Sequence, residues 1–373
     1  MGGVCGKASA VATVRPRFMG ADRGKPFSAI GTSGKQQNGI VEGLPEQFYE
    51  KYSIVMKKRG REGQDGDEGE EQECPEEIGH GAYSKVYKAT LRSDPEQIFA
   101  VKYVSIKRLT GLRGSEKAKQ ILKEVRRGVK VLQNLSHPNI ISIEDCFESS
   151  TAICVVLEYA PGGELYNHIV QRGFLTEREA SNFVRQVVLA TKFMHEQNVV
   201  HRDLKPENLV LGKVPEGDEE ISLKIIDFGF SRVITAPAMN SFVGTLNYVA
   251  PEILLRNDYD NKVDIWSIGC ITYVLLVGYL PFDREANHGA DEIEVEKIYF
   301  DQEDWQTISV SAKAFIIACL NRDPADRPTA ESLLTMAWLD PATHSAHGSR
   351  LQSPQKMSNM TADGMPKIAM IKW

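Results

Sequence analysis

His201-Arg202-Asp203-Leu204-Lys205-Pro206-Glu207-Asn208 is the stretch from which the fold and chemistry of this chain can be inferred. It brings together a carboxylate that can accept a proton (Asp203), a cation (Lys205) and an amide oxygen that can bind a metal (Asn208). Phosphoryl transfer needs a group that orients the attacking hydroxyl, a positive charge that neutralises the moving phosphoryl group and a ligand for Mg²⁺. The stretch therefore predicts phosphoryl-transfer chemistry in one short loop.

Four further motifs surround this loop. Gly79–Val86 (GHGAYSKV) and Ala100-Val101-Lys102 precede it, and Asp227-Phe228-Gly229 and Ala250-Pro251-Glu252 follow it. Glycines allow backbone N–H groups to approach phosphates that larger side chains would obstruct, and Asp227 supplies a second metal ligand. The order of glycine loop, lysine, HRD, DFG and APE is typical of protein kinases.

On these motifs the chain resembles the eukaryotic Ser/Thr protein kinases over residues 76–340. Gly244–Glu252 (GTLNYVAPE) and Asp326–Ala330 (DRPTA) resemble the calcium/calmodulin-dependent kinase group, and the N-terminus is similar to that of calcium-dependent kinases of plants and protists. No EF-hand loop follows the resembling region. The resemblance implies an α+β, two-lobed fold, with a strand-rich N-lobe over 76–160 and a helical C-lobe over 161–340.

The residue patterns agree with that implication. Apolar residues follow a strand pattern before Leu157 and a helical pattern after Leu165. The strand-like segments are 85–90, 98–104 and 152–157, and the helical ones are 116–135, 180–194, 263–277 and 312–320. The apolar run 265–282 contains polar residues and is closely flanked by others, so we expect a buried core helix rather than a membrane span.

Composition restricts the classes of function. A formal net charge of −6 gives no indication of a nucleic-acid partner. The six cysteines are scattered without a CxxC pair, which favours a reduced intracellular protein. Residues 1–10 lack the apolar stretch of a secretory signal, so a cytoplasmic location is expected.

The segments outside the resembling region suggest further organisation. We expect a disordered tail over 1–43, a lead-in and acidic insertion over 44–75, and a polar tail over 341–373. Gly2 could accept myristate and Cys5 palmitate, which would make the protein peripheral to a membrane. Gly6 stands where a serine or threonine is usual in such termini, and an ordinary cytosolic tail is the alternative.

The resemblance implies ATP and Mg²⁺ as cofactors. Lys102 would contact the α- and β-phosphates, and Asn208 and Asp227 would hold Mg²⁺. Ser84 stands where the third glycine of the loop is usual. The expected nucleotide-binding residues are Ile78, Gly79, Gly81, Ser84, Val86, Ala100, Lys102, Glu158, Ala160 and Leu209.

One position departs from the family pattern. In most kinases of this type Lys102 would pair with a glutamate nine residues before His137, where this chain has Gly128. Glu124, four residues earlier, lies on the same helical face and could replace the missing acid. Alternatively, the ion pair is absent and activity is reduced or differently controlled. Gly128 also weakens a helix by ~1 kcal/mol relative to alanine.

Other residues point to regulation and to scaffolding. Arg202 could pair with a phosphate in the segment between Asp227 and Glu252, which implies an upstream kinase as partner. The resemblance places that phosphate on Ser241, with Thr235 as the alternative, and Thr245 against Asp203. It also implies a Glu252–Arg327 bridge and an Asp264 that anchors the HRD backbone.

Two acids suggest the kind of protein substrate. Glu164 and Glu207 occupy positions where the resembling kinases bind an arginine three residues before the phosphorylated serine or threonine. A helix N-terminal charge is the alternative role for Glu164. The alternative to an active enzyme is a nucleotide-binding pseudokinase that acts as a scaffold. Only Gly128 supports that alternative.

Overall fold

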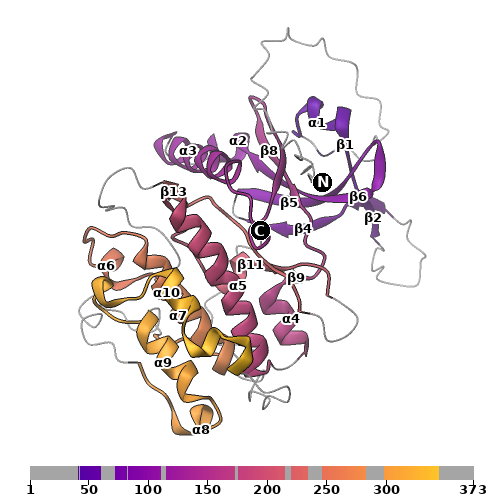
Figure 1. The fold of residues 1–373 in the computed structure, drawn as a ribbon. Helices are drawn as coiled ribbons and strands as arrows, with labels where there is room; N and C mark the ends of the chain where they lie inside the picture. Colours follow the sequence, from indigo (N-terminus) through magenta and orange to yellow (C-terminus); the bar gives the residue numbers. More distant parts are fainter. Residues whose placement is uncertain are drawn as a thin grey trace, which may run out of the picture.

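The computed structural model describes residues 41–343 except 42, 60–71, 82, 111–114, 173–174, 215–219, 234–245 and 283–297. Over these residues a strand-rich lobe is followed by a helical lobe, which confirms the two-lobed α+β fold (Figure 1). Several sites named above lie outside the described residues, namely Gly2, Cys5, Thr235, Ser241 and Thr245.

The N-lobe is built on an antiparallel sheet with the strand order β1-β5-β6-β8-β7, in which β4 also pairs with β5. Val86 faces Lys102 across β5 and β6, and Ala100 faces Leu157 across β6 and β8. The register therefore sets the lysine among the residues expected around the nucleotide. The strands are β1 (Tyr52–Ile54), β4 (Glu77–His80), β5 (Ser84–Leu91), β6 (Asp94–Ser105), β7 (Ile143–Glu148) and β8 (Ala152–Glu158).

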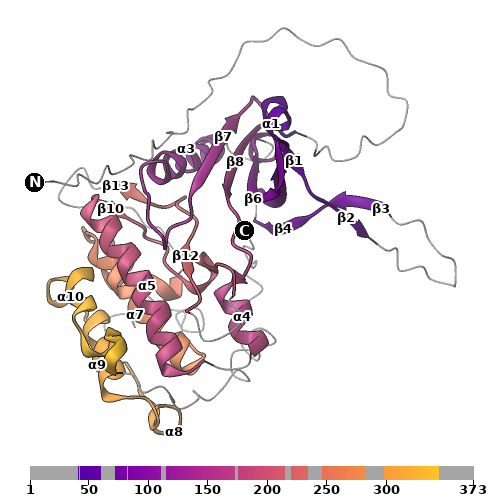
Figure 2. The same cartoon turned by 45° about the vertical axis from the view of Figure 1, so that its right-hand side comes forward.

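Strand β8 is apolar and buried from Ala152 to Leu157 because both of its faces are covered (Figure 2). Ile153 and Val155 belong to the large core that includes residues of α3 (Ser115–Leu132), which follows α2 (Ile106–Thr110). Cys154 and Val156 belong to a second cluster that includes a residue of α1 (Glu46–Lys51). A strand buried on both sides loses the polar–apolar alternation of a half-exposed one.

The lead-in helix α1 is packed into this second cluster. The ring of Phe48 is fully buried, stacks on Tyr52 and meets Phe147 edge-on. The Tyr52 hydroxyl donates a hydrogen bond to the carboxylate of Asp145, and the ammonium of Lys51 lies 2.5 Å from the same carboxylate. These contacts attach the chain before β1 to β7. A separate hairpin, β2 (Met56–Arg59) and β3 (Gln72–Pro75), follows β1.

The C-lobe is a group of helices with short strands at its upper edge (Figure 1). Thr176 and Glu179 form a reciprocal capping box at the start of α5, which satisfies two otherwise unpaired N–H groups. The helices are α4 (Leu165–Arg172), α5 (Glu177–Glu196), α6 (Pro251–Leu254), α7 (Lys262–Val277), α8 (Gln302–Trp305), α9 (Val310–Cys319) and α10 (Ala330–Leu334).

Short 3₁₀ turns and strands complete this lobe. Strand β11 pairs with β9 and β12, and β10 pairs with β13. The 3₁₀ turns are η1 (Pro206–Asn208), η2 (Leu246–Tyr248), η4 (Pro324–Asp326), η5 (Ala337–Leu339) and η6 (Pro341–Thr343). The strands are β9 (Gly163–Glu164), β10 (Val199–Val200), β11 (Leu209–Leu211), β12 (Leu223–Ile225) and β13 (Arg232–Val233).

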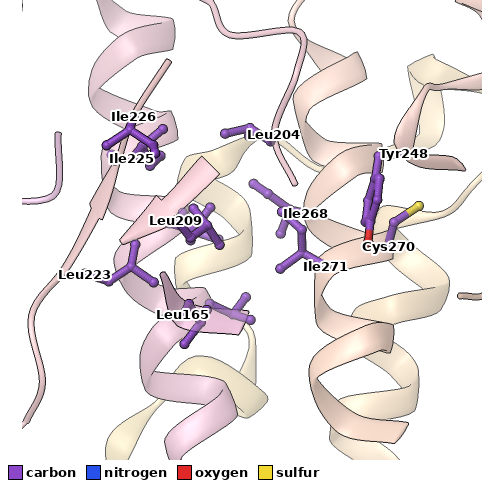
Figure 3. Packing of buried hydrophobic residues seen from close by; sticks show 14 of the residues in the cluster. Leu165, Leu204, Leu209, Leu223, Ile225, Ile226, Tyr248, Ile268, Cys270 and Ile271 are labelled. Carbon is purple, nitrogen blue, oxygen red and sulfur yellow. The ribbon is translucent and has the colours of Figure 1, made fainter. Parts of the chain in front are cut away.

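Helix α7 is the central helix of the lobe. Its residues from Val263 to Val277 are all buried, and Ile268 and Ile271 face the core that holds Leu204 and Leu209 (Figure 3). The expectation of a buried core helix is confirmed. In the described part of the chain, no helix combines the length and the apolar character needed to span a membrane.

A buried ion pair attaches the C-terminal end of the segment from Asp227 to Glu252, the activation segment, to the rest of the C-lobe. The two terminal guanidinium nitrogens of Arg327, Nη1 and Nη2, donate to the carboxylate of Glu252 at 2.7 and 2.8 Å. The guanidinium also lies 5.0 Å from the centre of the Trp266 ring. A bidentate pair of this kind is geometrically specific, so it fixes where α6 begins. The predicted Glu252–Arg327 bridge is confirmed.

Candidate active site

The loop His201–Asn208, here called the catalytic loop, is anchored to helix α7 by a buried carboxylate. Asp264 of α7 accepts hydrogen bonds from the backbone N–H of His201 (2.9 Å) and of Arg202 (2.8 Å). Its Oδ2 also lies 2.9 Å from Nε2 of His195. Burial opposes its ionisation, but His195, His201 and the backbone hydrogen bond together lower the pKa of Asp264. The predicted anchoring of the HRD backbone by Asp264 is confirmed.

Asp203, Lys205 and Asn208 converge above this anchor. Lys205 Nζ lies 3.0 Å from Asp203 Oδ2, and Asn208 Nδ2 donates to the same oxygen at 3.0 Å. Asn208 Nδ2 also donates to the backbone carbonyl of Asp203 at 2.8 Å. Because its amide nitrogen is used in this way, the amide oxygen of Asn208 is the atom left for a metal. The three chemistries of the HRDLKPEN stretch thus meet at one point.

Asp227 lies beside this loop, at the start of the DFG segment. The backbone of Ile226 donates to the carbonyl of Asn208 at 3.0 Å, which brings the two expected metal ligands together. Lys102 Nζ lies 3.2 Å from Asp227 Oδ1, and the Gly229 N–H donates to that oxygen at 3.2 Å. Burial raises the pKa of Asp227, but Lys102 and this hydrogen bond outweigh it, so the pKa lies below its usual value. Asp227 is therefore ionised at neutral pH.

The donor set at this point fits a hard divalent cation. Mg²⁺ prefers oxygen ligands and is commonly held by one or two carboxylates together with phosphate oxygens. An ionised carboxylate at Asp227 and an amide oxygen at Asn208 meet that requirement.

The expected nucleotide-binding residues are distributed over the N-lobe sheet and β11. Gly81 N–H donates to the carbonyl of Ser84 at 2.8 Å and so closes the glycine loop. Leu209 is buried in the large core, Ala100 packs against that core, and Val86 is buried on β5. Ile78 and Ala160 are more exposed.

Glu158 uses its side chain away from any nucleotide. Its carboxylate contacts Lys224 (2.9 Å) and the hydroxyl of Ser142 (3.2 Å). The contribution of Glu158 to nucleotide binding would therefore come from its backbone.

Helix α3 does not bring an acid to Lys102. Within the described residues, the carboxylate that forms an ion pair with Lys102 belongs to Asp227. Glu124 instead accepts a hydrogen bond from Gln120 Nε2 at 2.6 Å on its own helix. The pairing of Glu124 with Lys102 is therefore not found in this conformation, and the geometry corresponds to the alternative in which that ion pair is absent.

Three arginines gather where α3, the catalytic loop and β13 meet. Arg202 donates to the Phe230 carbonyl (2.8 Å) and to the Tyr259 hydroxyl (2.9 Å). Burial, and then the charges of Arg202 and Arg232, lower the pKa of Arg127, while the carboxylate of Glu124 acts in the opposite direction. The Nε of Arg127 is shielded from solvent and has no hydrogen-bond partner among the described residues. Guanidinium groups brought together in this way favour an anion between them.

Sequence reasoning found Arg202 but missed Arg127 and Arg232. Arg232 lies five residues after Asp227, and Arg127 directly precedes the unusual Gly128. Their closeness to Asp227 and Gly128 in the sequence was the available signal. The sequence does not show, however, which way a side chain on a helix points, so it did not place Arg127 near Arg202.

The two acids expected to bind substrate lie on adjoining elements, β9 and η1. Glu164 Oε2 accepts a hydrogen bond from Asn167 at 3.0 Å. The Oε2 of Glu207 is shielded from solvent and has no hydrogen-bond partner among the described residues. Burial raises the pKa of Glu207, with a smaller contribution in the same direction from Asp203, while Lys205 opposes it. Such a carboxylate gains from a cationic partner.

Comparison with known proteins agrees with this geometry. A protein kinase domain model matches residues 73–339. A calcium/calmodulin-dependent protein kinase type 1 of Caenorhabditis elegans is 41% identical over 276 residues, which cover 73% of this chain and 76% of that protein. A probable myosin light chain kinase of Dictyostelium discoideum is 39% identical over 265 residues, which cover 70% and 72%.

A calcium/calmodulin-dependent protein kinase type 1 of Macrobrachium nipponense is 39% identical over 264 residues, which cover 70% of this chain and 73% of that protein. Neither the matches nor the geometry of the loop favours a pseudokinase. The chain therefore belongs to the protein kinase family, as an ATP-dependent Ser/Thr kinase of the calcium/calmodulin-dependent kinase group.

Proposed function

We propose that this kinase uses Mg²⁺-bound ATP to phosphorylate serine or threonine in proteins that carry a basic residue three positions before the acceptor. The observation that supports this most is the convergence of Asp203, Lys205 and Asn208 beside the Lys102–Asp227 pair. These residues supply a proton acceptor, two cations and two oxygen donors for a metal.

The chemistry follows from these positions. The substrate hydroxyl is oriented by Asp203; as its oxygen forms a bond to the γ-phosphorus, the bond from that phosphorus to the leaving ADP oxygen breaks, and the hydroxyl proton passes to Asp203. Lys205 neutralises charge on the transferred group, and Lys102 binds the phosphates that remain on ADP. Asn208 and Asp227 would hold Mg²⁺, which neutralises phosphate charge when it is bound. Thr245 would contact Asp203.

Asp203→Asn should lower phosphate transfer to a basic peptide by about 10²–10⁴-fold, because the proton acceptor is lost. Affinity for a non-hydrolysable ATP analogue should stay within a few-fold, since Asp203 does not hold the nucleotide. Transfer from labelled ATP measures the first quantity and calorimetry the second. Asp258→Asn, an exposed aspartate, is the matched control. A wild-type protein that binds ATP without transferring phosphate would instead be a scaffold.

The proposed substrate preference rests on Glu207 and Glu164. An arginine of the substrate would supply the hydrogen-bond donor that Glu207 Oε2 lacks among the described residues, and a charge-assisted bond of that kind is among the stronger ones in proteins. Glu164 on the adjoining β9 would add a second negative charge.

Glu207→Gln should raise KM about tenfold or more for a peptide with arginine three residues before the acceptor, because a charged hydrogen bond is lost. The KM for the same peptide with alanine there should not change. In the wild type, KM for the arginine peptide should rise as pH falls through the raised pKa of Glu207, since only the carboxylate attracts arginine. Steady-state kinetics against pH measures this. An unchanged arginine preference in the variant would exclude Glu207.

Control by an upstream kinase is the proposed role of the arginine cluster formed by Arg127, Arg202 and Arg232. A phosphate on Ser241, or on Thr235 as the alternative, would neutralise these charges and fix the activation segment against the catalytic loop. The pKa of Arg127 is lowered by burial and then by the positive charges of Arg202 and Arg232; a nearby anion would offset the contribution of those two charges, which supports this role.

Ser241→Ala should abolish activation by phosphorylation, which we expect to be about tenfold or more because two or three charge-assisted hydrogen bonds are involved. Thr235→Ala should leave the activation intact. The ratio of kcat/KM before and after treatment with an activating kinase measures it. Full activation of Ser241→Ala would exclude this residue and leave Thr235 as the candidate.

The N-terminal sequence supports a cytoplasmic protein that associates peripherally with membranes through acyl groups on Gly2 and Cys5. A single acyl chain binds membranes only marginally, so a second signal would be needed for stable attachment, either an acyl group on Cys5 or the nearby basic residues Arg15, Arg17, Arg23 and Lys25. Metabolic labelling with a myristate analogue should label the wild type but not Gly2→Ala, and Cys5→Ala should shift the protein from the membrane to the soluble fraction. A wild type without label would exclude acylation of Gly2.

A further inference from the structure

Gly128 brings helix α3 into direct contact with the backbone of the DFG segment. A Cβ atom at this position would lie 2.6 Å from the carbonyl oxygen of Phe228, 2.9 Å from its carbonyl carbon and 3.2 Å from the nitrogen of Gly229. Non-bonded heavy atoms are most stable at about 3.5–4 Å. Any residue other than glycine would therefore move the helix and the DFG backbone apart by about 1 Å.

The carbonyl that Gly128 meets is part of the structure that holds Asp227. It accepts a hydrogen bond from the Ser231 N–H at 3.1 Å, which closes the turn after the DFG motif. Inside that turn, the Gly229 N–H binds the Asp227 carboxylate. Asp227 itself has a φ of 58°, a left-handed conformation that must be maintained by its surroundings in a residue with a side chain.

The C-lobe supports this segment from one side only. Arg202 binds the Phe230 carbonyl, and the ring of His201 meets the ring of Phe228 edge-on with 5.0 Å between centres. On the N-lobe side, the ammonium of Lys102 forms an ion pair with Asp227, and the surface of α3 at Gly128 meets the backbone of Phe228. The buried side chain of Phe228 also belongs to the large core that includes residues of α3. Since α3 brings no acid to Lys102, its effect on the segment comes through packing, which at Gly128 is direct contact with the DFG backbone.

We propose that Gly128 is a positioning residue, whose missing side chain lets α3 hold the DFG backbone, and with it Asp227, in place without a glutamate–lysine ion pair. In this view Gly128 replaces the usual acid by a different physical means. The proposal rests on the metal role proposed for Asp227, and the test below separates the two.

The test uses Gly128→Ala and Gly128→Glu in the full chain. Both should lower kcat about 10- to 100-fold, because a shift of about 1 Å at a reacting group has an effect of that size. In the nucleotide-free protein, hydrogen exchange of the amides from Phe228 to Ser231 should become at least several-fold faster. The gain in affinity for an ATP analogue on adding Mg²⁺ should shrink, while affinity without Mg²⁺ changes little.

Gly128→Glu gives the sharpest distinction. If the chain had simply lost an acid, restoring glutamate would raise activity; the Cβ contact with Phe228 predicts a fall. A gain in kcat for Gly128→Glu would overturn the proposal. So would unchanged kcat and unchanged exchange in Gly128→Ala; because alanine is the better helix former, a loss in that variant comes from the Cβ contact and not from a weakened helix.

Two further variants complete the design. Lys123→Ala, at an exposed position of the same helix, should match the wild type in kcat and exchange. Glu124→Gln should do the same, and a loss there equal to that of Gly128→Ala would identify an acid-based mechanism instead. Asp227→Asn should abolish the gain in affinity on adding Mg²⁺. If it does not, the metal role fails, while the exchange measurement still tests the contact made by Gly128.

Discussion

The active site depends on one buried carboxylate, that of Asp264, which accepts two backbone hydrogen bonds from the catalytic loop. A buried carboxylate is costly unless it is fully paired, and here it is satisfied by the two N–H groups that begin the catalytic loop and by His195. These bonds support Arg202 in a left-handed conformation with a φ of 69°. Asp203 follows directly, so its position is set by a helix at the centre of the C-lobe.

The remaining catalytic groups are positioned relative to that loop by backbone contacts. The Asn208 carbonyl accepts from Ile226, which places Asp227 beside the loop, and Arg202 holds the carbonyl of Phe230. Lys102 comes from the other lobe, on a strand whose register is fixed on both sides by β5 and β8. Two lobes thus contribute to one site, with the DFG segment as the piece that both of them contact.

Much of this could be predicted from sequence because the chemistry is concentrated in short, ordered motifs. The HRDLKPEN stretch, the DFG motif and Lys102 identified the family, and the roles of Asp264 and of the Glu252–Arg327 bridge followed from the resemblance. The prediction for Glu124 was less successful because helical spacing shows which residues share a face and not how closely that face approaches its neighbour. Gly128 was noticed as a missing acid, whereas its contact with Phe228 depends on a distance between distant segments.

Arg127 was missed for a related reason, since nothing in the sequence places it near Arg202 and Arg232. Arg127 and Gly128 are adjacent on α3, and this has a geometric consequence. Successive helix residues point about 100° apart, so Gly128, which faces the DFG backbone, sets the direction in which Arg127 leaves the same helix. Any movement of the helix therefore changes the surroundings of both residues together.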